Sequence, residues 1–281
     1  MRLAYQVAMP EVAASHLLTA YKGDLTEGFR LLKENGYDGA ELMICETGKE
    51  ARDTIKNLCG EFGLEISALV TGELYAHEGL SLSNHDPRVR EKCIARFHDF
   101  IDMAAELGSQ VNVGRSRGLY EPGVPHEATY AWALESLRSV VRYAERKQVT
   151  IILEPANFLQ CDFILSTQDG RDIVDQVGSP YFKIMIDVFH MSIQDKDMLA
   201  EIRASRGYFT YVHLCDNNRL YPGNCAFDFA AIVKALKETG YDCYAGVEVL
   251  QQPDMATAIR ESSRHLLPLI KEGIENERVL C

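Results

Sequence analysis

Apolar runs rich in β-branched and aromatic residues recur along the chain at fairly even intervals. Between them, apolar residues return every three or four positions, as over residues 28–33 and 97–104, which is the spacing of a helix with one buried face. The pattern therefore predicts strands that alternate with helices. Eight strands are expected, over residues 3–9, 39–45, 64–70, 109–114, 149–154, 182–188, 208–214 and 244–250.

Several of the predicted helices end in a glycine that a strand then follows. Glycine takes the left-handed conformation of a helix end without a steric penalty, so this order marks helix-to-strand junctions. The glycines are Gly36, Gly63, Gly108 and Gly240. The junctions over residues 32–39 and 236–243 resemble each other in sequence, as repeated helix-turn-strand units would.

The predicted strands are nearly continuous apolar runs, which is typical of a parallel sheet buried on both faces. Eight strand-helix units in 281 residues, without a linker rich in Ser, Gly or Pro, favour a single domain over residues 1–281. The expected fold is an α/β (β/α)₈ TIM barrel rather than an open doubly wound sheet. No Gly-x-Gly-x-x-Gly or Gly-x-x-x-x-Gly-Lys loop supports a nucleotide-binding role.

The charge balance excludes some partners. The chain has 29 basic and 41 acidic residues, a net charge of −12, which repels nucleic-acid phosphates and anionic lipid. The N-terminus is too polar for a signal peptide, and no apolar run approaches the ~18 residues of a membrane span. The eight cysteines include no Cys-x-x-Cys pair and are expected to be reduced thiols. We expect a cytoplasmic protein with no nucleic-acid or membrane partner.

Four ionisable residues stand at the carboxyl ends of the last four predicted strands, where TIM barrels carry their active sites. They are Glu154, Asp187, His213 and Glu248. Buried in apolar runs and left unpaired, such groups would cost several kcal/mol apiece, about the penalty of burying a lone charge. A shared divalent cation would remove that cost, although an Arg, a backbone N–H or a neighbouring His could also satisfy each one separately. Carboxylate oxygens with one imidazole suit Mn²⁺ or Mg²⁺, with Co²⁺ or Zn²⁺ as alternatives.

Two more polar residues follow these positions closely. His190 lies three residues after Asp187, and Arg219 lies six after His213. Either could be structural, since a histidine after a strand often caps a helix and a loop arginine often pairs with an acid. Beside a metal, both become hydrogen-bond donors for substrate oxygens, and we predict this role.

The order Glu154, Asp187-x-x-His190, His213-x₅-Arg219 and Glu248 resembles the sugar phosphate isomerase/epimerase superfamily of xylose isomerase-like TIM barrels. Within it the chain is most similar to the ketose 3-epimerases of the D-tagatose 3-epimerase type. The resemblance implies that the four residues hold a metal, most simply Mn²⁺, and that Glu154 and Glu248 also transfer protons. It further implies that His190 and Arg219 contact a small sugar or sugar phosphate. Proteins of this type often pair as dimers, so a homo-oligomer is one open alternative, although a single chain does not reveal its oligomeric state.

This resemblance predicts an isomerase that epimerises a ketose at carbon 3 through an enediolate. Aldose–ketose isomerisation needs only one base and stays open. The same site could also eliminate water, as in an inosose dehydratase-like lyase, or could belong to a non-catalytic sugar-binding barrel. A base-excision endonuclease on this barrel is disfavoured, because such enzymes need more metal ligands and a basic DNA-binding face.

The sequence departs from the family near the substrate. Gln160 stands where the family commonly has a substrate-contacting glutamate, and Phe158 replaces an arginine. Gln160 is therefore predicted to contact substrate as a neutral amide. Arg115 and Arg117 follow the fourth predicted strand and are expected to form a cationic spot for a phosphate or carboxylate. The alternative is that both are surface arginines paired with acids.

Overall fold

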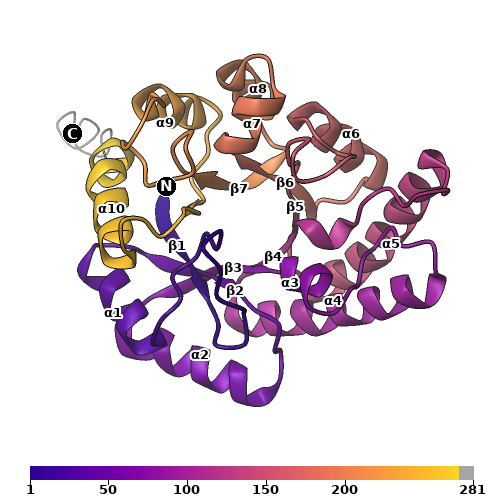
Figure 1. The fold of residues 1–281 in the computed structure, drawn as a ribbon, viewed down its shortest axis with the longest axis horizontal. Helices are drawn as coiled ribbons and strands as arrows, with labels where there is room; N and C mark the ends of the chain where they lie inside the picture. Colours follow the sequence, from indigo (N-terminus) through magenta and orange to yellow (C-terminus); the bar gives the residue numbers. More distant parts are fainter. Residues whose placement is uncertain (272–281) are drawn as a thin grey trace.

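Eight parallel strands close into a barrel in the computed structural model, which describes residues 1–271 (Figure 1). Each strand pairs with the next one along the chain, and the eighth returns to pair with the first, Tyr244 lying opposite Arg2. The strands are β1 (Arg2–Ala8), β2 (Gly39–Met43), β3 (Glu65–Val70), β4 (Gln110–Val113), β5 (Ile151–Leu153), β6 (Phe182–Asp187), β7 (Phe209–Leu214) and β8 (Tyr244–Val247). The predicted TIM barrel and its eight strands are confirmed. Residues 272–281 of the predicted domain lie outside the described residues.

Helices surround the barrel on its outer side (Figure 1). They are α1 (Leu25–Glu34), α2 (Lys49–Phe62), α3 (Gly72–Ala76), α4 (Pro87–Leu107), α5 (His126–Lys147), α6 (Thr167–Val177), α7 (Val188–Gln194), α8 (Met198–Ala204), α9 (Phe229–Glu238) and α10 (Met255–Lys271), with a 3₁₀ turn η1 (Arg115–Arg117). Gly63 and Gly108 end α2 and α4 with φ of 60° and 68°, as predicted for left-handed helix ends. Within residues 1–271, no helix combines the length and apolar character that crossing a membrane requires.

Two apolar layers hold the barrel together. The larger layer lies between the strands and the helices and includes Leu42, Phe97 and Val111, none of which is exposed. The smaller layer fills the inside of the barrel with small and large side chains from six of the eight strands. Its members are Ala4, Ala68, Ile152, Met185, Tyr211 and Tyr244. The barrel is therefore a packed core, and ligands can reach only its ends.

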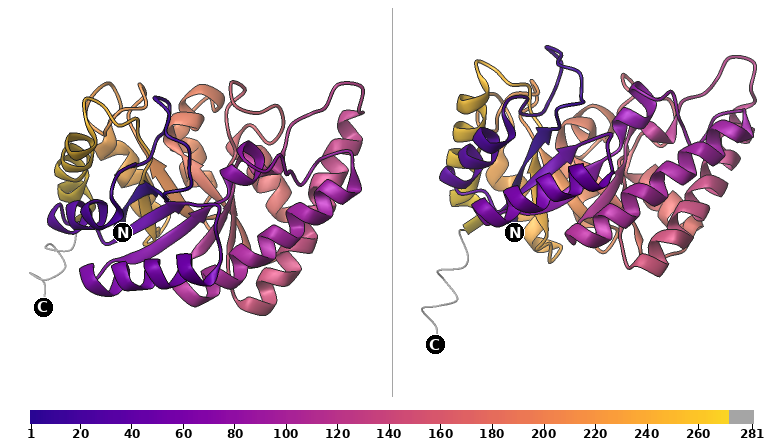
Figure 2. Two further views of the ribbon diagram at one scale, coloured as in Figure 1. Left: turned by 60° about the horizontal axis from the view of Figure 1, so that its bottom comes forward. Right: turned by 90° about the horizontal axis from the view of Figure 1, so that it is seen from below.

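The loops that follow the strands gather at one end of the barrel (Figure 2). The loop over residues 9–24, which connects β1 to α1, rises at the top of both views in indigo. Parallel strands bring all their carboxyl ends to the same rim, so residues that end different strands become neighbours there. This rim carries the four ionisable residues singled out in the sequence.

Candidate metal centre and active site

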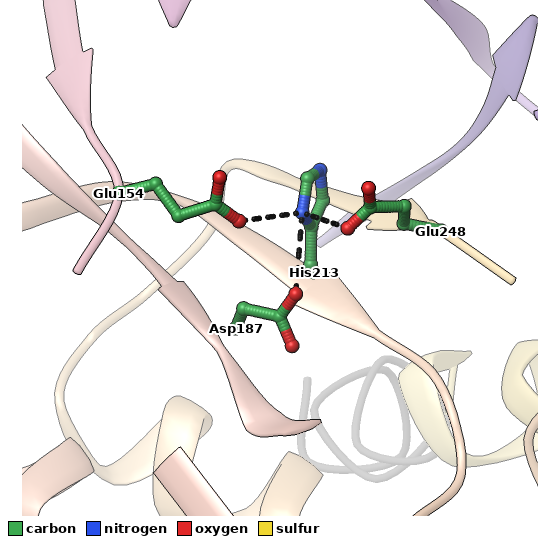
Figure 3. Close-up of side chains that lie close together, drawn as sticks. All are labelled: Glu154, Asp187, His213 and Glu248. Carbon is green, nitrogen blue, oxygen red and sulfur yellow. Dashed lines mark ion pairs between the residues drawn. The ribbon is translucent and has the colours of Figure 1, made fainter. Parts of the chain in front are cut away.

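The carboxyl ends of β5 to β8 carry three carboxylates and one imidazole. Asp187 is the last residue of β6 and lies beside His213 of β7, because the two strands pair in that register. Glu154 and Glu248 directly follow β5 and β8. One possible ligand atom from each of the four side chains lies within 4.8 Å of those of the others (Figure 3). The structure thus brings together the four side chains that the sequence placed at neighbouring strand ends.

The ring nitrogen Nδ1 of His213 faces all three carboxylates. It lies 3.0 Å from Oε2 of Glu248, 3.3 Å from Oε1 of Glu154 and 3.7 Å from Oδ2 of Asp187. Nδ1 of His213 and Oε1 of Glu154 are buried and have no hydrogen-bond partner among the described residues. Buried polar atoms without partners are costly, and a cation at the shared point would give both atoms a partner. Three carboxylates with one imidazole fit a divalent metal ion.

The charged side chains of this cluster shift one another's pKa. Burial alone would raise the pKa of Asp187 and Glu248, but Arg219 and His213 outweigh it. The pKa of Asp187 falls well below its usual range, and the pKa of Glu248 falls to about 2. Burial would likewise lower the pKa of His213, but Glu41 and Glu248 raise it well above 6.5. Without a metal, the centre therefore holds the ionised carboxylates of Asp187 and Glu248 beside the protonated imidazole of His213.

Arg219 lies between two of the carboxylates. Its Nη1 donates to Oδ2 of Asp187 at 2.8 Å, and its Nη2 donates to Oε2 of Glu248. The guanidinium also stacks on the ring of Phe189, 4.7 Å from the ring centroid. The backbone of Arg219 is left-handed, with φ of 62°, which is uncommon for a residue with a side chain and typical of functional loops. The structure therefore places the predicted arginine at the edge of the centre.

His190 also lies beside Asp187, and its ring has a defined tautomer. The amide of Asn157 accepts from the backbone N–H of Leu159 through Oδ1, so its Nδ2 faces Nδ1 of His190 at 2.7 Å. Because an amide nitrogen only donates, Nδ1 of His190 accepts and Nε2 carries the ring proton. Nε2 points into the centre, 3.7 Å from Oδ2 of Asp187. Burial lowers the pKa of His190, so the ring is a neutral donor aimed at the site.

Glu41 of β2 supports His213 and was not predicted from the sequence. Both of its carboxylate oxygens lie 2.9 Å from Nε2 of His213. The hydroxyl of Tyr211 donates to Oε2 of Glu41 at 3.2 Å, and a Cβ at Gly246 would come within 2.8 Å of that oxygen. Carboxylates commonly orient metal-binding histidines in this way. The available signal was a lone acid inside an apolar strand, the same signal that identified Asp187.

The other predicted substrate contacts lie in different environments. Arg115 begins η1, its side chain is 52% exposed, and its Nη2 lies 3.8 Å from Oε1 of Glu73. Arg117 is 1% exposed and donates to the backbone carbonyl of Ile164 at 3.3 Å. Gln160 is exposed on the loop after β5. The two arginines therefore do not present one joint surface, and only Arg115 is open to solvent.

Comparison with known proteins agrees with this geometry. The family described as "Xylose isomerase-like TIM barrel" matches residues 29–269. The 3-dehydro-D-guloside 4-epimerase of Escherichia coli K12 is 25% identical over 85% of this chain and 92% of its own. The ketose 3-epimerase of Arthrobacter globiformis is 27% identical over 75% and 72%. Among solved structures, that of an L-ribulose 3-epimerase has a TM-score of 0.82 at 19% identity, covering 99% of this chain and 97% of that one.

Proposed function

Because the chain belongs to the xylose isomerase-like TIM barrel family, we propose that it is a divalent-metal-dependent sugar epimerase. The reaction we propose is the epimerisation of a ketose at carbon 3 by proton transfer through an enediolate. The observation that carries this proposal is the convergence of Glu154, Asp187, His213 and Glu248 on one point. The relatives named as ketose 3-epimerase and L-ribulose 3-epimerase support it.

The reaction needs an acid, a base and charge stabilisation. A proton next to a ketose carbonyl is only weakly acidic. The four side chains would hold a divalent cation, which we propose is Mn²⁺, and the cation would supply positive charge to stabilise the enediolate. Arg219 adds a fixed positive charge beside the enediolate oxygens, and Nε2 of His190 donates a hydrogen bond to the substrate.

An epimerase must remove a proton from one face of the substrate and return one to the other. Glu154 follows β5 and Glu248 follows β8, and their carboxylates approach the imidazole of His213 from opposite sides (Figure 3). We assign them the two proton transfers. Each glutamate accepts the proton in one direction of the reaction and donates it in the other.

The solvent exposure of the side chains decides which residues we assign to the outer part of the substrate. Arg115, half-exposed at the end of β4, is the side chain we propose for a phosphate or carboxylate on the substrate. Gln160 follows Asn157 on the loop after β5, and we propose that it binds a neutral hydroxyl. Arg117 is buried, so in this proposal its guanidinium supports the loop at Ile164.

A second candidate substrate is a keto-glycoside. The relative from Escherichia coli is named as a 3-dehydro-D-guloside 4-epimerase, in which the carbon that changes configuration adjoins the carbonyl carbon. The proton chemistry is the same as at carbon 3 of a ketose. The same four-residue centre could therefore act on either substrate. The two candidates differ in the part of the substrate that contacts the rim of the barrel.

A deuterium-exchange screen tests the proposal. Protein loaded with Mn²⁺ is incubated in D₂O with ketoses, ketose phosphates, 3-keto-glycosides and inososes, and products are followed by NMR. We expect deuterium next to the carbonyl together with the epimer of one class. Loss of water would indicate a lyase, and exchange with an aldose product would indicate an isomerase. Binding of a sugar without exchange would contradict the enzyme and favour a sugar-binding barrel.

A further inference from the structure

Thr19 reaches the metal centre from the loop between β1 and α1. Its hydroxyl Oγ1 lies 3.0 Å from Oε1 of Glu248 and 3.0 Å from Oε1 of Gln6. Its backbone carbonyl accepts from the N–H of Val249 at 3.1 Å. Thr19 therefore holds the end of β8 at two points, through the backbone next to Glu248 and through the carboxylate itself.

The direction of the hydroxyl hydrogen bond follows from counting protons. A threonine hydroxyl has one proton, and the ionised carboxylate of Glu248 can only accept it. Because that proton goes to Glu248, Gln6 pairs with Thr19 only if its side-chain amide is turned over, so that Nε2 in place of Oε1 faces the hydroxyl oxygen. The same orientation gives a partner to Nε2 of Gln6, which is fully buried and otherwise has none. In this orientation the side-chain oxygen Oε1 of Gln6 has no partner, and proteins tolerate an unpaired carbonyl oxygen more readily than an unpaired N–H. The result is a chain of donors from Gln6 through Thr19 to Glu248.

The other oxygen of Glu248 is held from the opposite loop. Oε2 accepts from Arg219, whose backbone carbonyl accepts from the N–H of Leu250 at 2.8 Å. The loop that carries Thr19 and the loop that carries Arg219 thus each contact the end of β8 through one backbone and one side-chain hydrogen bond. Glu154 differs, because its Oε1 has no hydrogen-bond partner among the described residues. The two glutamates are therefore unequally restrained.

We propose that Thr19 is a positioning residue that fixes the carboxylate of Glu248, so that Oε2 stays directed at the metal point. The inference rests on the proposed function for its catalytic meaning, since Glu248 is one of the two proton-transfer residues there. The contact itself concerns only the orientation of the Glu248 carboxylate, which can be tested without substrate. It also gives the loop over residues 9–24 a role in the site, which the sequence analysis did not assign to it.

Metal affinity measures this orientation without any substrate. Thr19→Val removes the hydroxyl and keeps the shape, whereas Thr19→Ser keeps the hydroxyl. Removal of a group that orients a metal ligand costs about 10–100-fold in affinity, so Thr19→Val should bind Mn²⁺ at least about tenfold more weakly in a calorimetric titration. Thr19→Ser should restore most of the affinity. Thr54→Val on the exposed face of α2 is the matched control and should bind like wild type. Wild-type affinity in Thr19→Val would overturn the proposal.

A double-mutant cycle on the metal-free protein separates this inference from the proposed function. Thr19→Val, Glu248→Met and the double variant are unfolded with urea in the presence of a chelator. We expect the destabilisation by Thr19→Val to be smaller once Glu248 is replaced by Met, because only the contact with Gln6 is then left to lose. Additive effects would show that Thr19 and Glu248 do not interact and would overturn the proposal. If wild-type protein bound no Mn²⁺, the metal-dependent function would fail, and the cycle would still decide whether Thr19 holds Glu248.

Discussion

Glu41 and His213 form a buried pair across the barrel, with both carboxylate oxygens 2.9 Å from Nε2 of the imidazole. The pair leaves Nδ1 of His213 as the nitrogen that faces the three carboxylates at the strand ends. Burial raises the pKa of Glu41, and His213 acts against that rise. Each residue thus stabilises the charged form of the other in the buried interior. Together they determine which ring nitrogen of His213 is free to bind a metal.

Replacement of Glu41, which is not itself a proposed metal ligand, should therefore lower the affinity for Mn²⁺. Glu41→Gln removes the charge that orients the imidazole, and we expect Mn²⁺ affinity to fall about 10–100-fold. Tyr211→Phe keeps the carboxylate of Glu41 and removes one hydrogen bond to it, together with a hydroxyl contact to Ser67, and should have a smaller effect. Calorimetric titration of the two variants measures both. Unchanged affinity in Glu41→Gln would contradict the assigned role.

The ligands themselves should be needed for metal-dependent stability. A cation that binds only the folded state stabilises it by about 2.7 kcal/mol when its concentration is about 100-fold above Kd. Asp187→Asn and His213→Ala should lose most of that stabilisation, and their melting temperatures should no longer rise with added Mn²⁺. Metal analysis after dialysis provides the second readout. Full occupancy in both variants would show that the cluster is assigned wrongly.

Metal binding should release a proton near neutral pH. The pKa of His213 is raised well above 6.5 in the metal-free protein, so the ring is protonated there, whereas a metal ligand must be neutral. Affinity should therefore increase as pH rises toward the folded-state pKa of His213. The ion pairs of the protonated ring stabilise the metal-free fold below the unfolded-state pKa, and this contribution is lost as pH rises through the folded-state pKa. Titrations in two buffers with different ionisation enthalpies should show about one proton released. A heat independent of the buffer would contradict this prediction.

Much of the architecture was readable from local patterns. The strands were predictable because apolar runs and glycine helix ends recur, and the four site residues because each interrupts an apolar strand end. The contact between Glu41 and His213 joins residues 172 positions apart, and only the closure of the barrel brings them together. Thr19 lies in a loop without hydrophobic periodicity, so its contact with Glu248 had no local signal. Arg117 follows Arg115 by two residues, yet the 3₁₀ turn directs one side chain inward and the other outward.

The exposed arginine should set the response to substrate charge. A charge-assisted hydrogen bond contributes roughly 1.5–3 kcal/mol, so Arg115→Ala should raise KM for a phosphorylated or carboxylated substrate about tenfold or more. KM for the neutral analogue should change little. Arg117→Met serves as the comparison and should lower thermal stability, because it removes a buried contact to Ile164. If Arg115→Ala leaves KM unchanged for both substrates, Arg115 is a surface residue without a role in binding.

Deuterium incorporation by variants of Glu154 and Glu248 tests their assigned proton transfers most directly. Glu154→Gln and Glu248→Gln keep the size of each side chain and remove its capacity to carry a proton at neutral pH. The substrate is the sugar into which the wild-type protein incorporates deuterium. Each variant is incubated in D₂O and Mn²⁺ with one epimer of this sugar and, separately, with the other. We predict that neither variant interconverts the epimers. Each variant should still exchange deuterium, but only into the epimer whose proton faces the remaining glutamate. Epimerisation within about tenfold of wild type in either variant would contradict the assignment of Glu154 and Glu248 as the two proton-transfer residues.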